Sequence, residues 1–165
     1  MEIRILKIEE LEIVKDLAYR IWPKTYGHII SQDQMTYMLN WMYSLETLET
    51  NFNKNHTYIC LSSNGIDIGF LDLETNDPAL GNMKIHKIYV LPEFHGKGFG
   101  YELMKKARDF ALENDMNSLT LQVNRDNKAV DFYKRYGFEI IDEKDFDIGN
   151  GFYMNDFVMR YNINN

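Results

Sequence analysis

The sequence predicts a single domain of α/β (α+β) class over residues 1–165, with a mixed central sheet of about six to seven strands and flanking helices. Its 165 residues are enough to bury one sizeable core but not two. Apolar residues keep helical spacing in the first third of the chain and change to strand-like spacing at His56. From residue 83 to 141 the pattern is strand, helix, strand, helix, strand, which favours a mixed sheet.

The first third begins with a strand and is otherwise mostly helical. Residues 2–7 alternate enough for a strand, and a helical pattern runs from Ile8 until Pro23 ends it. Ser31 and Gln34 form a capping box, in which each side chain binds a free backbone N–H group at the start of a second helix. Residues 45–52 predict a further turn or short helix.

A β-hairpin follows the helical third. The strand-like segments 57–61 and 66–73 are joined through Asn64–Gly65, a pair that takes the positive φ angles of a type I′ turn. The segment Asn76–Pro78 then breaks the chain before the next strand, 83–90.

The second half of the chain completes the sheet. A glycine-rich turn leads into its first helix, and Gly137 stops the second one. The expected segments are the helices 101–112 and 127–135 and the strands 118–123, 138–141 and 157–161.

Composition and charge exclude several classes of function. A net charge of -7 disfavours nucleic acid and anionic membranes as partners and favours neutral or cationic small molecules. No apolar run approaches the roughly 20 residues of a membrane-spanning helix. The single cysteine, Cys60, cannot form an internal disulfide, so we expect a cytoplasmic protein with a buried structural thiol rather than a nucleophile.

The segment from Val90 to Tyr101 has the features of an anion site. It leaves a strand, passes the alternating glycines Gly96, Gly98 and Gly100, and enters a helix. Free N–H groups at a helix start carry the positive end of the helix dipole, and glycines let the backbone approach a pyrophosphate closely. The alternative is a tight turn that uses glycine only for its conformational freedom.

Two common nucleotide motifs do not fit this segment. The Walker pattern needs a lysine followed by serine or threonine, which is absent. The dinucleotide fingerprint needs a glycine where Tyr101 stands and an acidic residue where Asn124 stands. A nicotinamide-dependent enzyme is therefore disfavoured.

A second motif follows about 30 residues after the glycines. Its residues are Asn124, Asn127, Ala129, Phe132, Tyr133, Gly137 and Phe138. Together with His95 to Gly100, this motif resembles the GNAT superfamily of acetyl-CoA-dependent N-acetyltransferases, and the order of strands and helices is similar over nearly the whole chain. Family members usually open the first motif with glutamine or arginine, where this chain has His95, but the backbone N–H donors do not depend on that side chain.

The resemblance implies a GNAT fold, acetyl-CoA as co-substrate, and a cleft where the strand over 83–90 splays from the strand over 118–123. The opened strand then offers unpaired N–H groups where negative charge develops on the thioester oxygen. Backbone groups of the strand hold the pantetheine arm, and N–H groups of the turn hold the pyrophosphate. The implied contacts with acetyl-CoA are Ile88, Tyr89, Val90, His95, Gly96, Lys97, Gly98, Phe99, Gly100, Tyr101, Asn124 and Asn127.

Tyr133 is the proton donor that the resemblance implies for the departing thiolate. It follows Asn127 by six residues, the place from which family members set a phenol beside the cofactor sulfur. A phenol pKa of about 10 suits that task. The alternative is that the ring packs beside Phe132 and Tyr136 as core.

The acceptor amine must lose a proton, and His86 is the expected base or relay. By alternation it shares a strand face with Ile88 and Val90 and so points to the cleft, and an imidazole pKa of about 6.5 suits proton transfer near neutrality. Certain arylalkylamine acetyltransferases have a histidine at the matching position. The alternatives are a histidine hydrogen-bonded within the sheet, or Tyr26 or Glu102 as the base.

The expected acceptor is a small aliphatic polyamine such as spermidine or spermine. The segments from Ile21 to Ser31 and from Asp147 to Asp156 resemble the bacterial Pai-type polyamine acetyltransferases. A polycation is drawn to a chain of net charge -7 and is held by aromatic faces and carboxylates. The candidate substrate contacts are Trp22, Tyr26, Asp33 and Tyr153, which alternatively pack the N-terminal helices. A peptide N-terminus is the rival acceptor.

We expect direct transfer in a ternary complex, with no acyl-enzyme and no metal. The histidines show no ligand spacing; they are His28, His56, His86 and His95. The competing class is a non-catalytic acetyl-CoA-binding regulatory module, which the presence of Tyr133 disfavours. The sequence is compatible with a homodimer and does not decide the oligomeric state.

Overall fold

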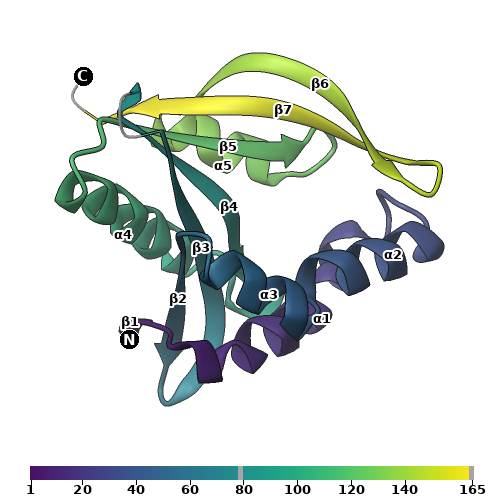
Figure 1. Ribbon diagram of the computed structural model, residues 1–165, viewed down its shortest axis with the longest axis horizontal. Coiled ribbons are helices and arrows are strands. Elements are labelled where there is room, and N and C mark those ends of the chain that lie inside the picture. The colour runs from purple at the N-terminus through teal and green to yellow at the C-terminus, as the bar shows by residue number, and fades with distance from the viewer. Residues whose placement is uncertain (78–79, 164–165) are drawn as a thin grey trace.

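The computed structural model describes residues 1–77 and 80–163, with only the backbone at 76–77. Its centre is a seven-stranded sheet in the order β1-β2-β3-β4-β5-β7-β6 (Figure 1). The neighbours β4 and β5 are parallel and all other neighbours are antiparallel, which confirms the expected mixed α/β fold. The strands are β1 (Glu2–Ile5), β2 (His56–Ser63), β3 (Ile66–Asp77), β4 (Asn82–Val90), β5 (Ser118–Asn124), β6 (Glu139–Gly149) and β7 (Phe152–Asn162).

Helices pack on both faces of this sheet. The helices are α1 (Glu12–Tyr26), α2 (Gln32–Tyr43), α3 (Leu45–Phe52), α4 (Phe99–Glu113) and α5 (Ala129–Tyr136). The first three lie to one side of β2, β3 and β4, and α4 lies to the other (Figure 1). On the first side Tyr43 packs edge-on against Phe70, with ring centroids 6.2 Å apart. On the second side Leu103 packs above Gly69 and Val90.

The first helix differs from its prediction at both ends. Residues 8–10 form a turn of 3₁₀ helix, and α1 starts only at Glu12. Pro23 lies inside α1, and the Gly27 N–H group donates to the Pro23 carbonyl at 3.1 Å. The ring of Tyr26 packs on the buried ring of Trp22, with centroids 4.6 Å apart. This packing outweighs the one backbone hydrogen bond that a proline removes, so the helix continues past it.

The predicted capping box forms only in part. The Ser31 hydroxyl accepts from the Gln34 backbone N–H group at 3.1 Å, as expected for the first residue before α2. The Gln34 side chain does not return to Ser31 and instead donates to the Tyr153 carbonyl at 2.8 Å. The second half of the motif therefore joins α2 to β7.

The hairpin between β2 and β3 has the predicted turn. Asn64 and Gly65 have φ angles of 51° and 77°, both positive as a type I′ turn requires. The sequence predicts that Asn76–Pro78 interrupts the strand pattern. In the structure β3 extends to Asp77, and Pro78 lies outside the described residues.

The hairpin of β6 and β7 is much longer than predicted. Each strand has 11 residues, whereas the sequence suggested only 138–141 and 157–161. The stretch from Asp142 to Asp145 is polar and exposed, so its alternation of apolar and polar residues is lost. The hydroxyl of Tyr37 in α2 donates to the Ile148 carbonyl at 2.7 Å and holds the end of the hairpin over the helix (Figure 1).

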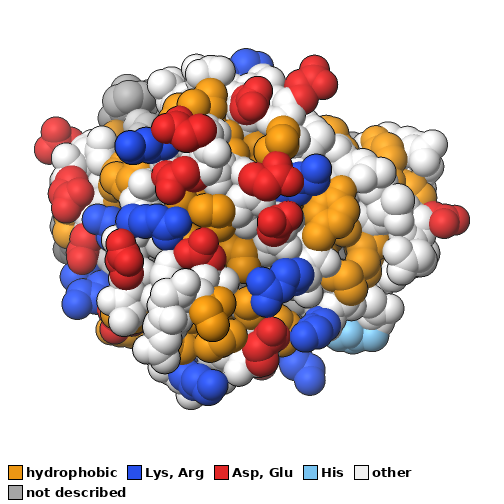
Figure 2. All heavy atoms as spheres, turned by 90° about the horizontal axis from the view of Figure 1, so that it is seen from below, with side chains coloured by type: hydrophobic (Ala, Val, Ile, Leu, Met, Phe, Trp, Pro, Cys, Tyr) orange, Lys and Arg blue, Asp and Glu red, His pale blue; other side chains and the backbone are white. Residues whose placement is uncertain are grey.

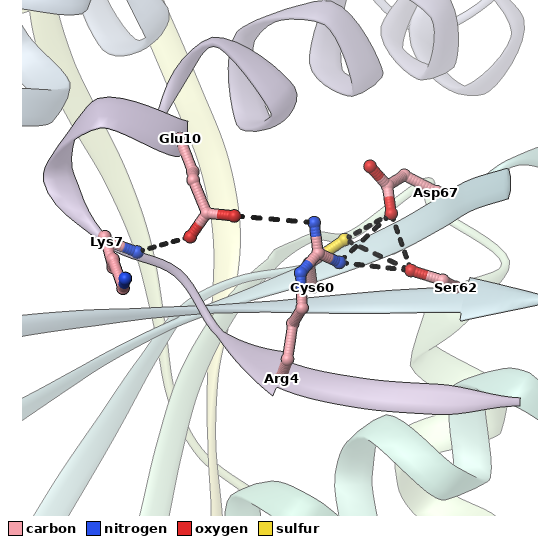
Figure 3. A network of polar contacts seen from close by, with 6 residues as sticks. All are labelled: Arg4, Lys7, Glu10, Cys60, Ser62 and Asp67. Carbon is pink, nitrogen blue, oxygen red and sulfur yellow. Dashed lines mark hydrogen bonds and ion pairs between the residues drawn. The ribbon is translucent and has the colours of Figure 1, made fainter. Parts of the chain in front are cut away.

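Cys60 is a structural thiol, as expected. It is fully buried in β2, and its sulfur donates to an Asp67 carboxylate oxygen at 3.3 Å (Figure 3). Burial and the Asp67 charge raise the pKa of this thiol to about 12. Arg4 and Ser62 bind the same carboxylate oxygen, so the network ties β1, β2 and the start of β3 together.

Acidic and basic side chains are interspersed on the face seen from below in Figure 2. That face presents no continuous basic surface of the kind that binds a phosphate backbone. No helix in the described part of the chain is long and apolar enough to cross a membrane.

Candidate functional site

The parallel strands β4 and β5 separate halfway along their length. They pair only between Asn82–Ile85 and Ser118–Leu121. Beyond these residues β5 pairs with β7 alone and β4 with β3 alone. The predicted splayed cleft is therefore present, and its volume is about 1020 Å³.

Most of the predicted site residues line this one cleft. The lining comes from α1, α2, β4, the glycine turn, β5, α5 and β7. Three residues named from the sequence lie outside it, namely Asp33, Lys97 and the alternative base Glu102. Asp33 is exposed in the first turn of α2, and the Lys97 ammonium lies 5.1 Å from the centre of the Phe94 ring.

A β-bulge changes the position of His86. Asp72 pairs with Lys87 and Leu73 with Ile85, which leaves His86 as the extra residue of β4. The prediction that His86 shares a face with Ile88 and Val90 is therefore wrong, because alternation fails at a bulge. The side chain still lines the cleft.

His86 belongs to a hydrogen-bonded cluster on the side of the sheet that faces α1 and α2. Its Nε2 atom lies 2.5 Å from a Glu74 carboxylate oxygen, and its ring stacks on His56 with centroids 4.5 Å apart. The His56 Nδ1 atom lies 2.6 Å from Asp72, which also accepts from the Lys87 ammonium at 2.7 Å. Burial lowers the pKa of His86 below its usual value, which weakens it as a proton acceptor.

The same cluster is the group of residues that could hold a metal. Ligand atoms of His56, Glu74 and His86 lie within 4.8 Å of one another. The spacing of His56 and His86 along the sequence does not indicate this group, because only the pairing of β2, β3 and β4 brings these distant residues together. The hydrogen bonds of the cluster satisfy these groups among themselves. That the reaction needs no metal stays a prediction.

The glycine turn forms a cradle that faces the cleft. Gly96 and Gly98 have φ angles of 75° and 84°, and a Cβ atom added to either would meet no atom within 4 Å. Gly98 directly precedes α4, whose first N–H groups have no partner within the helix. The backbone N–H groups of residues 96–101 find no acceptor in the described parts of the chain. The geometry fits a phosphate group.

The side chain of His95 is already used within the protein. Its Nε2 atom lies 2.8 Å from the Val90 carbonyl oxygen, so the ring ties the turn back to the end of β4. The backbone N–H groups, rather than this side chain, are therefore the donors that the turn offers to an anion.

The two asparagines of the second motif shape the connection from β5 to α5. The Asn124 side chain accepts from the Asp126 N–H group, and the Asn127 side chain accepts from the Ala129 N–H group, each at 2.9 Å. The Asn127 amide also lies 3.5 Å from the Tyr26 hydroxyl and so reaches across the cleft.

Tyr133 lines the cleft from α5. Its ring packs near Phe132 and Phe138, with centroids 5.5 and 5.8 Å away, so the packing alternative also holds. Its hydroxyl finds no hydrogen-bond partner in the part of the chain that the structure describes. Burial raises the pKa of this phenol above its usual value, so the group is protonated at neutral pH, and the same shift makes it a weaker acid than a free phenol.

The substrate contacts expected near α1 are only partly available. The Trp22 side chain is buried, and its indole N–H group donates to the Tyr43 hydroxyl at 3.2 Å, so it mainly supports the floor of the cleft. Tyr26 lies above it, and Tyr153 lines the outer end of the cleft with half of its surface exposed.

Asp156 is a site residue that sequence analysis missed. It lies on β7, lines the cleft, and is only 4% exposed. No hydrogen-bond donor reaches its carboxylate from the described residues. Burial raises its pKa to about 6, although Arg125 and Lys84 act in the opposite direction. In the sequence, Asp156 is one polar residue before a predicted strand over 157–161. The true length of β7, and the pairing that turns this side chain inward, were not predicted.

The chain matches the family model for an acetyltransferase (GNAT) domain over residues 28–156. A spermidine N(1)-acetyltransferase of Thermoplasma acidophilum is 26% identical over 148 residues, which cover 86% of this chain and 90% of that protein. An uncharacterized N-acetyltransferase of Methanocaldococcus jannaschii is 36% identical over 89 residues, but these cover only 50% of this chain and 38% of the relative. A ribosomal protein bS18 alanine N-acetyltransferase of Haemophilus influenzae is 29% identical over 110 residues, which cover 67% of this chain and 72% of that protein.

Among solved structures, the PaiA N-acetyltransferase of Thermoplasma acidophilum in complex with coenzyme A superimposes with a TM-score of 0.80. It is 25% identical and the match covers 98% of this chain and 99% of that one. The splayed strands and the glycine cradle thus occur in a chain whose fold and sequence agree with one family over most of its length. The chain belongs to the GNAT family of acetyltransferases.

Proposed function

We propose that the protein is an N-acetyltransferase that moves an acetyl group from acetyl-CoA to a primary amine bound in the same cleft. The observation that supports this most is that the opened end of β4 lies beside the unpaired N–H groups of the glycine turn, in one cleft. A cleft of about 1020 Å³ has room for two ligands, so no acyl-enzyme is needed.

The backbone supplies most of the contacts for acetyl-CoA in this proposal. N–H groups of residues 96–101 hold the pyrophosphate, and the backbone of Ile88 and Val90 holds the pantetheine arm. Asn124 and Asn127 line its other side. Bound acetyl-CoA supplies an activated acetyl thioester. Unpaired N–H groups of β4 then stabilise the negative charge that develops on the thioester oxygen.

Two proton transfers complete the reaction. Tyr133 donates its phenolic proton to the departing sulfur. His86 is one of the groups in the cleft that could accept the proton of the amine, and it would act together with Glu74, to which it is hydrogen-bonded. The cytoplasm, where Cys60 stays reduced, is the proposed location.

A polyamine is the proposed acceptor. The relative from Thermoplasma acidophilum is named a spermidine acetyltransferase, the chain has a net charge of -7, and the aromatic rings of Trp41 and Tyr153 lie partly exposed at the cleft. Cations bind such rings and carboxylates. A peptide N-terminus is the second candidate, because a relative acts on the alanine of a ribosomal protein.

The test is a panel of acceptors at two salt concentrations. Coenzyme A release is measured with spermidine, spermine, amino acids, aminoglycosides and short peptides. We expect kcat/KM to be highest for a polyamine and to fall at higher salt, because charge attraction is screened. A peptide acetylated at least about tenfold more efficiently than any polyamine, or polyamine turnover that ignores salt, contradicts the polyamine assignment. Binding of acetyl-CoA without turnover of any amine favours the regulatory module instead.

A further inference from the structure

We infer that Asp156 receives the acceptor amine, pairing with its ammonium group and then taking its proton before the amine attacks. The inference rests on the proposed function and assigns a catalytic residue to it. Three features of Asp156 carry it: its burial, the absence of a hydrogen-bond donor to its carboxylate among the described residues, and its position where β4 and β5 are already separated.

The first argument concerns an unpaired charge. Asp156 is 96% buried, since its exposed fraction is 4%, and no donor from the described residues bonds to its carboxylate. A buried carboxylate is costly unless a cation or a hydrogen-bond donor compensates it. Asp72, which is also buried, shows the usual solution, because Lys87 and His56 both bond to it. Among the described residues, Asp156 therefore presents to the cleft an anionic group with which a cationic ligand can pair.

The second argument concerns position. Asp156 is the cross-strand neighbour of Asn124, the last residue of β5, and both side chains line the cleft. Cross-strand neighbours lie about 5 Å apart on one face of a sheet. Asn124 is also a proposed contact of acetyl-CoA. An ammonium group bound by Asp156 thus lies beside a residue that lines the proposed path of acetyl-CoA.

The third argument concerns the surrounding charges. The Arg125 guanidinium is bonded to Glu143 and Asp145 of β6, so it is engaged elsewhere. On β6, the residue paired with Asp156 is Lys144. Its ammonium lies 3.1 Å from the Asp142 carboxylate, so it is also paired elsewhere.

The remaining groups that face Asp156 are Lys84 of β4 and the neutral phenol of Tyr26 in α1. Lys84 also faces Glu74 and Asp72, and burial lowers its pKa. The amount of positive charge near Asp156 is thus too small to suppress its affinity for a proton. In agreement, burial raises the pKa of Asp156 to about 6, close to the range in which a general base works best.

The proton balance is complete without a further reactant. The ammonium passes one proton to the Asp156 carboxylate, and the freed lone pair forms the C–N bond to the thioester carbonyl carbon. The C–S bond then breaks, and the sulfur receives a proton from Tyr133. The second proton lost by the nitrogen restores the Tyr133 phenol. Asp156 gives its proton to water as the product leaves.

Asp156 is better placed for this role than His86. The Nε2 atom of His86 is bonded to Glu74 at 2.5 Å and its ring is stacked on His56, whereas no described residue donates a hydrogen bond to Asp156. Burial favours the neutral form of both groups. For a carboxyl this raises the pKa and strengthens the base, and for an imidazole it lowers the pKa and weakens the base.

The test compares Asp156→Asn, His86→Gln and Asp16→Asn over pH 5–9, with the amine that wild type acetylates best. Asp16 is an exposed carboxylate on α1 and is the matched control. We expect Asp156→Asn to lower kcat/KM by at least about 10²-fold and to remove the inflection on the acid side. The Kd of acetyl-CoA should stay within about twofold, since the asparagine keeps the shape of the cleft. The control should keep both the rate and the inflection.

Three results overturn the inference. Undiminished turnover in Asp156→Asn excludes the role, and so does an acid-side inflection that persists in this variant. Loss of the inflection in His86→Gln alone returns the base to His86. If wild type acetylates no amine at all, the proposed function fails before the variants are compared, so the two failures are distinguishable.

A measurement on wild-type protein guards against a variant that does not fold. Carbon-13 labelled aspartate is followed by NMR as the pH changes. We expect one carboxyl signal to titrate near pH 6, and its pKa to fall when spermidine is added to the coenzyme A complex, because an ammonium stabilises the carboxylate. The absence of any such signal contradicts the inference.

Discussion

The phenol oxygens of Tyr26 and Tyr89 lie 2.8 Å apart, and this contact joins α1 to the part of β4 that β5 leaves unpaired. The Asn127 amide approaches the same Tyr26 oxygen from the start of α5, at 3.5 Å. Three separate elements around the cleft thus meet at one hydroxyl group. Tyr26 therefore links the first helix to β4 and to the start of α5 across the cleft.

Replacing Tyr26 with phenylalanine should impair the acceptor side of the cleft. The Tyr89 hydroxyl loses its partner in a buried place, so we expect stability to fall by about 1 kcal/mol. The KM of the amine should rise about five- to tenfold while the Kd of acetyl-CoA changes little, since the glycine turn is untouched. Tyr19→Phe is the control, because Tyr19 lies on the same helix and bonds to Asn40 at an exposed place. Equal amine KM values for the two variants contradict the role of Tyr26.

The cradle formed by the glycine turn is tested by Gly98→Val. A side chain at this position projects into open space where the phosphate is proposed to sit. We expect the affinity for acetyl-CoA to fall at least about tenfold in calorimetry. Gly65→Val is the matched control, because Gly65 also has a positive φ angle and no neighbour within 4 Å, but lies in the hairpin between β2 and β3. A valine at a positive φ angle strains the backbone by about 1–2 kcal/mol in both variants. Only a difference between their affinities for acetyl-CoA is therefore informative. Undiminished affinity in folded Gly98→Val removes the turn from the site.

Tyr133→Phe separates proton donation from packing. The ring remains and only the hydroxyl is lost, so the stability should change by less than about 1 kcal/mol. We expect kcat to fall about 10²-fold and the Kd of acetyl-CoA to be retained. Tyr136→Phe, one helical turn away and half-buried among aromatic rings, should keep full turnover. Equal kcat in wild type and Tyr133→Phe assigns the residue to packing alone.

Asp156 should make the free protein less stable at neutral pH. Its pKa is raised on folding to about 6 from an ordinary value of 3.8. The folded state therefore holds this proton more tightly, so stability is greatest at low pH and is lost as the pH rises from about 4 through 6. Asp156→Asn removes this loss of stability. The variant should therefore be more stable than wild type at pH 7.5, by an amount on the order of 2–3 kcal/mol.

At pH 4 the two proteins should unfold at similar denaturant concentrations. A wild type that is the more stable protein at pH 7.5 would show that the carboxylate has a partner in the folded state. Denaturant unfolding at both pH values measures the difference directly.

Local patterns in the sequence predicted the elements better than their lengths. The Asn64–Gly65 turn, the Ser31 cap and the helix end at Gly137 each depend on residues next to one another in the chain, and all three are present. Pro23 is different, because the packing of Trp22 on Tyr26 decides whether α1 continues. That contact depends on tertiary structure.

The site was predictable to the extent that it depends on backbone motifs. The glycine turn follows from the order of residues in the chain, and the two asparagines follow from the resemblance to the GNAT family. The bulge at His86 does not, because it is a property of the pairing between β3 and β4, and a shift of one residue reverses the face of a side chain. Asp156 was missed for a similar reason, since only the register of β7 against β5 brings it beside Asn124.

The most direct test of direct acetyl transfer follows both products in one reaction. Wild type is mixed with acetyl-CoA and spermidine in a buffer that contains EDTA, and free coenzyme A and acetylated spermidine are quantified over time. The account predicts that the two products appear in equal molar amounts and that coenzyme A is not released when the amine is omitted. Coenzyme A release without acetylated amine, or binding of acetyl-CoA with neither product formed for any amine, contradicts it.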